Sequence, residues 1–413
     1  MTWGGFSGGA RAVERCRLLA CPPYSDWPDG LYRAYLTPAH RAASDQLLQW
    51  MGEAGMVARI DAAGNVVGRY AGNTNAPVLL IGSHIDSVRD AGAYDGPLGI
   101  MLGIECVDAF HRRGQRLPFA IDVIAFGDEE GSRFPASMLT SRAVAGTLDP
   151  GHLAISDGEG VALSAALLDY GLDLAAVPSA AYPSGGVRAY LEAHIEQGPV
   201  LEAEGLALGV VTAIAGQRRM AVTLTGVPGH AGTSAMSLRH DALAAAAEAV
   251  LAVERIARAG KPDLVATVGR LSVGPGAANV VPGRADFTID IRSGDDADRD
   301  AATDAIADAL QEIAARRSIA LAMEETQVLP ASPCDPELTD RLATAIALTG
   351  QTPRHLVSGA GHDAMVMAAL APTVMLFIRC TGGISHNPAE DVMIEDVEQA
   401  LTAMLRFMEG LAA

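Results

Sequence analysis

The sequence predicts an α/β fold with a mostly parallel sheet, into which a ferredoxin-like α+β domain is inserted. Apolar runs rich in Val, Ile and Leu alternate with helical segments in the first half and again near the end. Between these parts, the order strand–helix–strand–strand–helix–strand is that of a split βαβ unit. We expect a first α/β part over 1–213, the insertion over 214–329 and a second α/β part over 330–413.

The outer α/β part is predicted element by element from periodicity and residue type. Helical periodicity that ends in glycine predicts a helix over 38–55, and Val, Leu and Ile runs predict buried strands. Its further elements are strands at 65–70, 76–86, 119–127 and 372–379, and helices at 98–112, 336–349 and 395–411.

The insertion has a different texture, with alternating apolar residues in its strands and alanine-rich helices. Its expected strands span 218–227, 264–273, 285–293 and 319–329, and its expected helices span 241–260 and 296–317.

Composition restricts the possible partners. The chain has 413 residues, 49% of them hydrophobic, and this composition predicts a globular protein. Its net charge of −19 disfavours binding to nucleic acid and to anionic membranes. Residues 1–16 have no signal-like apolar run, and no run approaches the length that spans a bilayer. Five scattered cysteines favour reduced thiols, so we expect a cytoplasmic protein.

The strongest local signal is GSHIDSVRDAGAYDGPLG, residues 82–99. His84 and Asp86 lie two apart at the end of an apolar strand, where a carboxylate can fix the tautomer of a metal-binding imidazole. Asp95 follows in a glycine-rich loop. A structural histidine with a satisfied side chain is the competing interpretation of this motif taken alone.

Three more clusters follow other apolar runs. GDEEGSRF, residues 127–134, contains adjacent Glu129 and Glu130, and a solvated acidic turn is the competing interpretation. LEAHIEQGPVLE, residues 191–202, contributes His194, and GGISHNPAE, residues 382–390, contributes His386. Together these mixed histidine and carboxylate sets suit Zn²⁺ or Mn²⁺.

With these motifs in this order, the chain resembles the hydantoinase/carbamoylase group of dinuclear metal amidohydrolases, which are related to aminopeptidase-like metallopeptidases. The resemblance implies a metallohydrolase domain with two divalent ions, Zn²⁺ or Mn²⁺, with Co²⁺ or Ni²⁺ as alternatives. It implies that Asp95 bridges the ions, that Glu129 is the general base and that Asp86 orients a histidine. The implied metal ligands, not divided between the two ions, are His84, Asp95, Glu130, His194 and His386.

The resemblance also gives the insertion a role as lid and dimerisation domain. GVPGHAGTSAMSLRHDA, residues 226–242, resembles the segment that supplies an oxyanion donor, here His230, to its own or a neighbouring subunit. Arg292 resembles the residue that binds a substrate carboxylate, and the loop before it contains Asn279. The implied substrate-binding residues are Gln197, His230, Asn279, Arg292, Gly359 and Gly383, and His362 is expected to shape the pocket.

The function implied is hydrolysis of a carbon–nitrogen bond in a small ureido carboxylate within purine nitrogen metabolism. Allantoate amidohydrolase, which releases ammonia and CO₂, is the first choice. The alternatives are an N-carbamoyl-L-amino acid hydrolase or β-ureidopropionase and, more distantly, a metallo-aminopeptidase or a non-catalytic binding protein. A homodimer formed through the insertion is expected.

Overall fold

The computed structural model describes residues 7–412 of the chain and divides it into two compact units. Unit 1 comprises residues 1–212, 334–356 and 361–413, and unit 2 comprises residues 213–333 and 357–360. Residues 1–6, part of the segment for which the sequence predicts no signal peptide, lie outside the described residues. No helix within 7–412 is long and apolar enough to cross a bilayer, and the five cysteines carry free thiols.

The sheet of unit 1 confirms the predicted α/β class, with a parallel centre and antiparallel edges. Its order is β1-β2-β4-β3-β5-β15-β6, with β14 beside β6 and β13 beside the last residues of β6. The central strands β4, β3, β5 and β15 are mutually parallel. The strands are β1 (Val57–Ile60), β2 (Val66–Tyr70), β3 (Ala76–His84), β4 (Phe119–Phe126), β5 (Val187–Ile195), β6 (Leu208–Ile214), β13 (Ser332–Pro333), β14 (His355–Ser358) and β15 (Thr373–Ile378). Of these, β13 and the last two residues of β6 and of β14 fall within unit 2.

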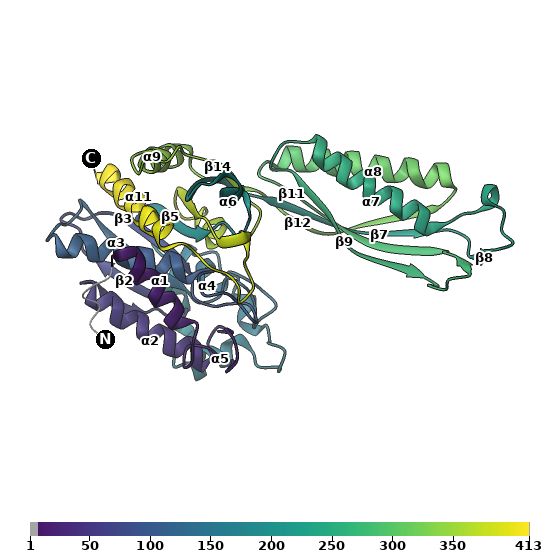
Figure 1. Cartoon of the computed structure of the whole chain (residues 1–413). Coiled ribbons are helices and arrows are strands. Elements are labelled where there is room, and N and C mark those ends of the chain that lie inside the picture. Colours follow the sequence, from purple (N-terminus) through teal and green to yellow (C-terminus); the bar gives the residue numbers. More distant parts are fainter. Residues whose placement is uncertain (1–6, 413) are drawn as a thin grey trace. The chain divides into compact units, whose positions relative to one another are not determined.

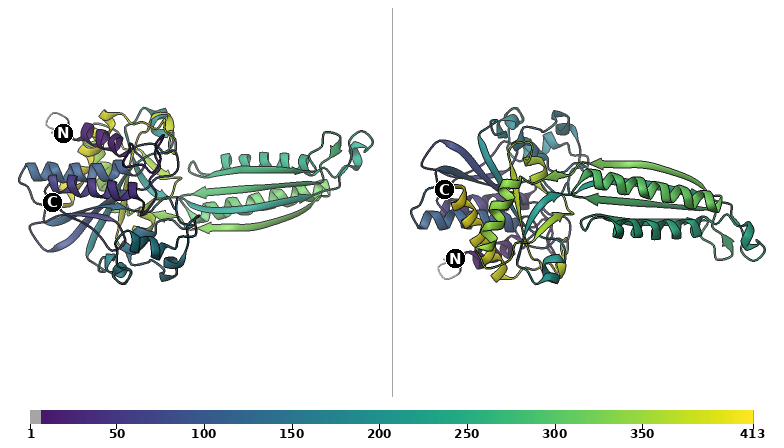
Figure 2. Two further views of the ribbon diagram at one scale, coloured as in Figure 1. Left: turned by 90° about the horizontal axis from the view of Figure 1, so that it is seen from below. Right: turned by 90° about the horizontal axis from the view of Figure 1, so that it is seen from above.

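Helices cover this sheet and enclose the main core (Figures 1 and 2). Helix α3 packs on β3, β4 and β5, and α1 and α11 pack against α3 and against each other. The longer helices of unit 1 are α1 (Gly8–Leu19), α2 (Pro38–Glu53), α3 (Pro97–Arg112), α9 (Pro336–Ala347) and α11 (Ile394–Ala412). Shorter helices are α4 (Leu139–Ala145), α5 (Leu163–Asp169), α6 (Val200–Glu204) and α10 (Asp363–Met367).

Unit 2 is an antiparallel sheet with two helices on one face (Figure 2). Its sheet order is β12-β7-β11-β9, and α7 and α8 bury their apolar sides against it. The elements are β7 (Gly216–Thr225), α7 (Ala242–Ala259), β9 (Val265–Gly274), β11 (Arg284–Ser293), α8 (Asp296–Arg317) and β12 (Ala320–Leu329). The short strands β8 (Gly229–His230) and β10 (Val280–Val281) pair separately.

Gly99 fixes how closely α3 approaches the sheet. A Cβ atom at this position would lie 2.1 Å from the backbone oxygen of Ala193 and 2.9 Å from Cβ of Ser83. The start of α3 therefore lies directly against the ends of β3 and β5. Because Asp95 precedes this helix by two residues, the same contact sets the height of Asp95 above His84 and His194.

We expect Gly99→Ala to lower the midpoint of urea unfolding by the equivalent of about 1–3 kcal/mol, because backbone must move to admit the methyl group. Gly52→Ala is the matched control: Gly52 lies in α2, with nothing within 4 Å of the added Cβ, so alanine should be neutral or mildly stabilising. Equal midpoints for the two variants would contradict the close approach.

Candidate metal centre

The proposed site residues lie at the carboxyl ends of the four parallel strands. His84 is the last residue of β3, and Glu129 and Glu130 follow β4. His194 is the penultimate residue of β5, and His386 lies in the segment that follows β15. Parallel strands place their carboxyl ends at one edge of the sheet, which is where open α/β sheets bind ligands.

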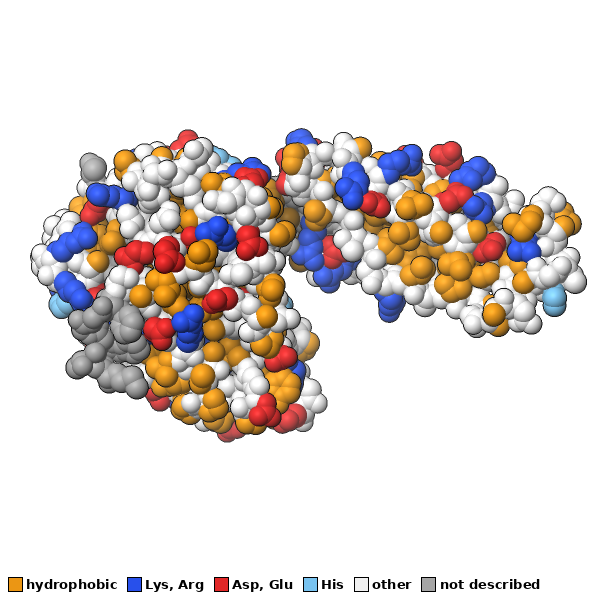
Figure 3. Space-filling view, in the orientation of Figure 1, with side chains coloured by type: hydrophobic (Ala, Val, Ile, Leu, Met, Phe, Trp, Pro, Cys, Tyr) orange, Lys and Arg blue, Asp and Glu red, His pale blue; other side chains and the backbone are white. Residues whose placement is uncertain are grey.

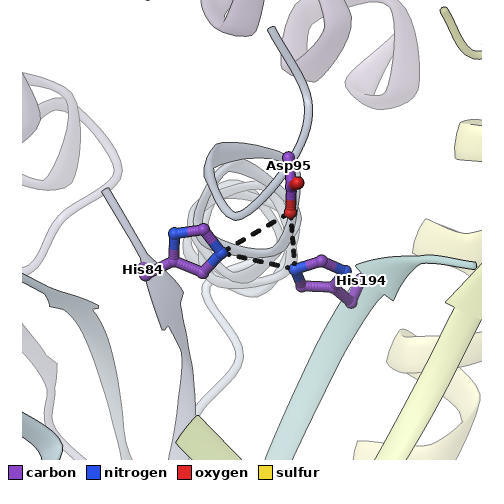
Figure 4. A group of neighbouring side chains, drawn as sticks. All are labelled: His84, Asp95 and His194. Carbon is purple, nitrogen blue, oxygen red and sulfur yellow. Dashed lines mark hydrogen bonds and ion pairs between the residues drawn. The ribbon is translucent and has the colours of Figure 1, made fainter. Parts of the chain in front are cut away.

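Asp95 lies at the centre of three histidines. Its Oδ1 is 3.6 Å from Nε2 of His84 and 3.2 Å from Nε2 of His194. Figure 4 shows the three side chains pointing toward one another. Its Oδ2 is 3.2 Å from Nε2 of His386. Burial alone would raise the pKa of Asp95, but the hydrogen bonds from His194, His386 and His84 outweigh it and hold that pKa well below its ordinary value.

Two overlapping groups of side chains have the geometry of metal sites, and Asp95 belongs to both. His84, Asp95 and His194 form a fully buried group whose ligand atoms lie within 4.8 Å of one another. Asp95, Glu130 and His386 form the second group, in which His386 is exposed and its Nε2 lies 3.5 Å from Glu130. The sequence left this division of ligands open.

The two buried histidines are oriented by backbone carbonyl groups. Nδ1 of His84 lies 3.1 Å from the carbonyl oxygen of Asp86, and Nδ1 of His194 lies 2.9 Å from that of Ile195. These contacts direct both Nε2 atoms towards Asp95, as ligands of a shared site require. The Asp86 carboxylate, expected to orient His84, lies farther from Nδ1, at 3.5 Å.

The Asp86 carboxylate also organises the Glu129–Glu130 turn. Its two oxygens accept the backbone N–H groups of Glu129 at 3.0 Å and of Glu130 at 3.1 Å. Asp86 therefore connects the turn after β4 to the end of β3. Since β3 ends at His84, Asp86 belongs to the loop and not to the strand face that the sequence predicted.

Glu129 and Glu130 differ in their surroundings. Glu129 is buried, and this burial, together with the nearby carboxylates of Glu130, Asp363 and Asp86, raises its pKa well above the ordinary value despite the opposing effect of His84. Burial raises the pKa of Glu130 to about 7. Glu129 also forms a third possible ligand group with His84 and Glu130, so geometry alone allows it to act as either base or ligand.

A second layer around Asp95 was missed by sequence reasoning. Ser385 Oγ donates to Asp95 Oδ2 at 2.8 Å, and Gln197 Nε2 donates to the same oxygen at 2.9 Å. Glu390 accepts the backbone N–H groups of Tyr94 at 2.7 Å and Asp95 at 3.1 Å. The available signal was the position of Ser385, directly before His386. Gln197, expected to contact substrate, here contacts Asp95.

Two more expected pocket residues belong to unit 1. The His362 ring packs edge-on against His194, with ring centroids 4.5 Å apart, and it is absent from the ligand groups found within residues 7–412. Gly383 has a left-handed backbone (φ 64°), and a Cβ atom there would lie 2.6 Å from the carbonyl carbon of Gly198. This glycine is therefore required for close packing of two loops.

The expected substrate residues of unit 2 lie at two ends of its sheet. His230 is exposed and pairs with Val280, and Ala231 N–H donates to the carbonyl of Asn279 at 2.9 Å. Arg292 lies at the far end of β11, where Asp290 accepts two of its N–H groups and the Gly359 carbonyl accepts another. From Arg284 to Arg292 the strand alone extends roughly 27 Å.

Comparisons with known proteins agree with this architecture. The family model described as peptidase family M20/M25/M40 matches residues 80–410. The chain is 41% identical to allantoate deiminase 1 of Glycine max, with 96% of this chain and 88% of that protein covered. It is 42% identical to an N-carbamoyl-L-amino acid amidohydrolase of Geobacillus stearothermophilus, with 89% and 90% covered. A hydantoinase/carbamoylase family amidase from Burkholderia multivorans matches with a TM-score of 0.89 and 36% identity over 98% of both chains.

We expect Ser385→Ala to weaken binding of divalent metal by about tenfold, because Asp95 loses a donor that fixes its carboxylate. Titration against a chromogenic chelator measures this affinity. Ser184→Ala, in an exposed loop, is the control and should bind metal like the parent protein. Equal affinities in all three proteins would show that Ser385 does not position Asp95.

Proposed function

Because the chain belongs to peptidase family M20/M25/M40, we propose that it is an amidohydrolase that cleaves a carbon–nitrogen bond of a small ureido carboxylate. Allantoate is the first choice of substrate, with release of ammonia and CO₂. The observation that carries the proposal is the shared carboxylate of Asp95, which joins two histidine-containing ligand groups at one edge of the sheet.

The donor set of this cluster fits two divalent ions. Imidazole nitrogens and carboxylate oxygens in each group suit Zn²⁺ or Mn²⁺, and Co²⁺ or Ni²⁺ tolerate the same ligands. His84 and His194 would hold one ion, Glu130 and His386 the other, and Asp95 both. When bound, such a pair lowers the pKa of a water molecule towards about 7 and withdraws electrons from a carbonyl oxygen.

Glu129 is the proposed proton carrier. Its carboxylate takes a proton from the attacking water and delivers it to the leaving nitrogen, which avoids expelling an amide anion. The turn that holds Glu129 is fixed through the contacts of its backbone with Asp86, so the carboxylate has a defined position. His230 is the proposed donor to the oxyanion of the tetrahedral intermediate.

Substrate choice within this class rests on a carboxylate and a ureido group. Arg292 is the proposed partner of the carboxylate, with Asn279 as a further polar contact. Allantoate and N-carbamoyl-L-amino acids both carry these groups. The relatives named for the two activities have nearly the same sequence identity to this chain, 41% and 42%. N-carbamoyl-L-amino acid hydrolysis is therefore the second candidate. A metallo-aminopeptidase or a non-catalytic binding protein would not hydrolyse the ureido group.

We also propose a homodimer formed through unit 2 in the cytoplasm. Hydrophobic side chains gather on the surface of this unit (Figure 3). Its exposed large hydrophobic residues include Leu251 of α7 and Val265 of β9. Because His230 and Arg292 lie at opposite ends of the sheet of unit 2, one chain's unit cannot supply both to one small substrate. His230 then acts on the substrate of the neighbouring subunit. The free thiols favour a reducing compartment.

We expect ammonia release from allantoate by the metal-loaded protein, with a smaller kcat/KM for N-carbamoyl-L-amino acids. Glu129→Gln should lower kcat by about 10²–10⁴-fold while two metal equivalents remain bound, because a base is lost and not a ligand. Loss of one equivalent would reassign Glu129 as a ligand. Release from N-carbamoyl-L-amino acids alone would overturn allantoate as the substrate, and no release from any ureido compound would overturn the proposed function.

Subunit complementation tests the donation of His230 between subunits. Glu129→Gln and His230→Ala homodimers should each be nearly inactive. A heterodimer of the two variants, purified through two different tags, should recover about half of the activity of the unmodified protein, because one of its two sites has both groups. A heterodimer as inactive as the two variant homodimers would mean that His230 acts in its own chain. A monomeric mass in solution would exclude the dimer itself.

A further inference from the structure

A hollow lined by three arginines lies in unit 1 and shares no residue with the His/carboxylate cluster. Its volume is about 610 Å³, within the range of pockets that hold small metabolites. The arginines belong to β1, to β2 and to the loop before β4, and the segment 179–183 forms another wall. The lining residues used below are Val57, Arg59, Arg69, Arg116 and Tyr182.

The register of β1 and β2 explains why these arginines meet. Val57 pairs with Arg69, and Arg59 pairs with Val67, so all four side chains project from one face of the antiparallel pair. Ala58 and the other residues of the opposite face pack towards the main core. The exposed face therefore brings Arg59 and Arg69 to the same side, beside the exposed side chain of Val57.

Arg69 is held rigidly as part of one wall. Its Nε and Nη2 donate to the two oxygens of the buried Asp122 at 2.7 Å and 2.6 Å, and Tyr182 donates its hydroxyl to the same carboxylate. Asp122 is fully buried, and its ion pair with Arg69 balances its charge. This triad fixes the wall. It occupies the Nε and Nη2 edge of the Arg69 guanidinium and leaves Nη1 outside these hydrogen bonds.

Arg59 and Arg116 form no ion pair with a carboxylate within residues 7–412. Among residues 7–412, Arg69 is the member of the three that forms an ion pair. Arg116 is nevertheless ordered, because its Nη1 donates to the carbonyl of Ala71 at 2.8 Å and its guanidinium lies 3.9 Å from the centroid of the Tyr70 ring. A preorganised guanidinium loses little entropy when it binds an oxyanion.

We propose that this hollow binds a small anion that carries a phosphate or carboxylate group. Arg59 and Arg116 supply positive charge that is not held in an ion pair, Arg69 and Tyr182 form a fixed polar wall, and Val57 offers an apolar surface to the remainder of the ligand. Planar guanidinium groups match both oxyanions with paired hydrogen bonds. On a chain with a net charge of −19, two unpaired arginines in one hollow are an unusual local excess of positive charge.

The hollow is separate from the proposed catalytic centre. Arg116 precedes the first residue of β4, whereas Glu129 and Glu130 follow its last residue, and the strand between them extends roughly 23 Å. A ligand in the hollow therefore lies outside the proposed substrate site. The inference is independent of which ureido compound the protein hydrolyses.

The test is calorimetric titration of the metal-loaded protein with two probes, inorganic phosphate and succinate, at low and at moderate salt. We expect one or both to bind, and the double variant Arg59→Met/Arg116→Met to weaken that binding at least tenfold. Arg112→Met, an exposed arginine of α3 outside the hollow, is the matched control and should bind like the parent. Binding should weaken as salt is raised.

The two probes distinguish the ligand's chemistry: stronger phosphate binding assigns a phosphate ligand, and stronger succinate binding assigns a carboxylate ligand. An anion held by the metal ions would bind equally to the parent and to the double variant. That equality, or the absence of binding by both probes, would overturn the proposal. Thermal unfolding of the double variant, expected to match that of the parent, verifies that its fold is intact.

Discussion

The contact of one buried carboxylate with three imidazoles is the interaction on which the site depends. Asp95 reaches His84 and His194 through one oxygen and His386 through the other. An isolated charge in this position would be costly to bury, so it persists because each oxygen has partners. The surrounding chain serves this arrangement: Glu390 holds the backbone of Asp95, and Gly99 lets α3 approach the strands that carry the histidines.

Parallel strand topology turns motifs that are distant in sequence into one site. Each motif follows a strand of the central parallel set, and this is why the sequence predicted the location of the site from apolar runs that end in histidine or acid. The elements predicted at 38–55, 98–112 and 119–127 correspond to α2, α3 and β4, since their periodicity and length are unambiguous. Local pattern also predicted the strands and helices of unit 2.

Other features depend on contacts that no local pattern encodes. Ser385 and Glu390 act on Asp95 from 290 and 295 residues farther along the chain, so their roles emerge only when β15 lies beside β5. Helix α1 was not predicted, because its two glycines lower helix propensity and its buried Arg11 and Arg15, which pair with Glu105, interrupt the apolar face. The backbone carbonyl groups that orient His84 and His194 are equally invisible in residue identities.

The order of the strands constrains biosynthesis. Strand β15 lies between β5 and β6, both of which precede unit 2 in the chain, and His386 follows β15. During vectorial translation the ribosome therefore releases every residue of unit 2 before the strand that completes the central sheet of unit 1. Until that strand inserts, β5 and β6 present unpaired edges to the cellular environment, and the nascent protein depends on this late insertion both to protect those edges and to acquire its last imidazole.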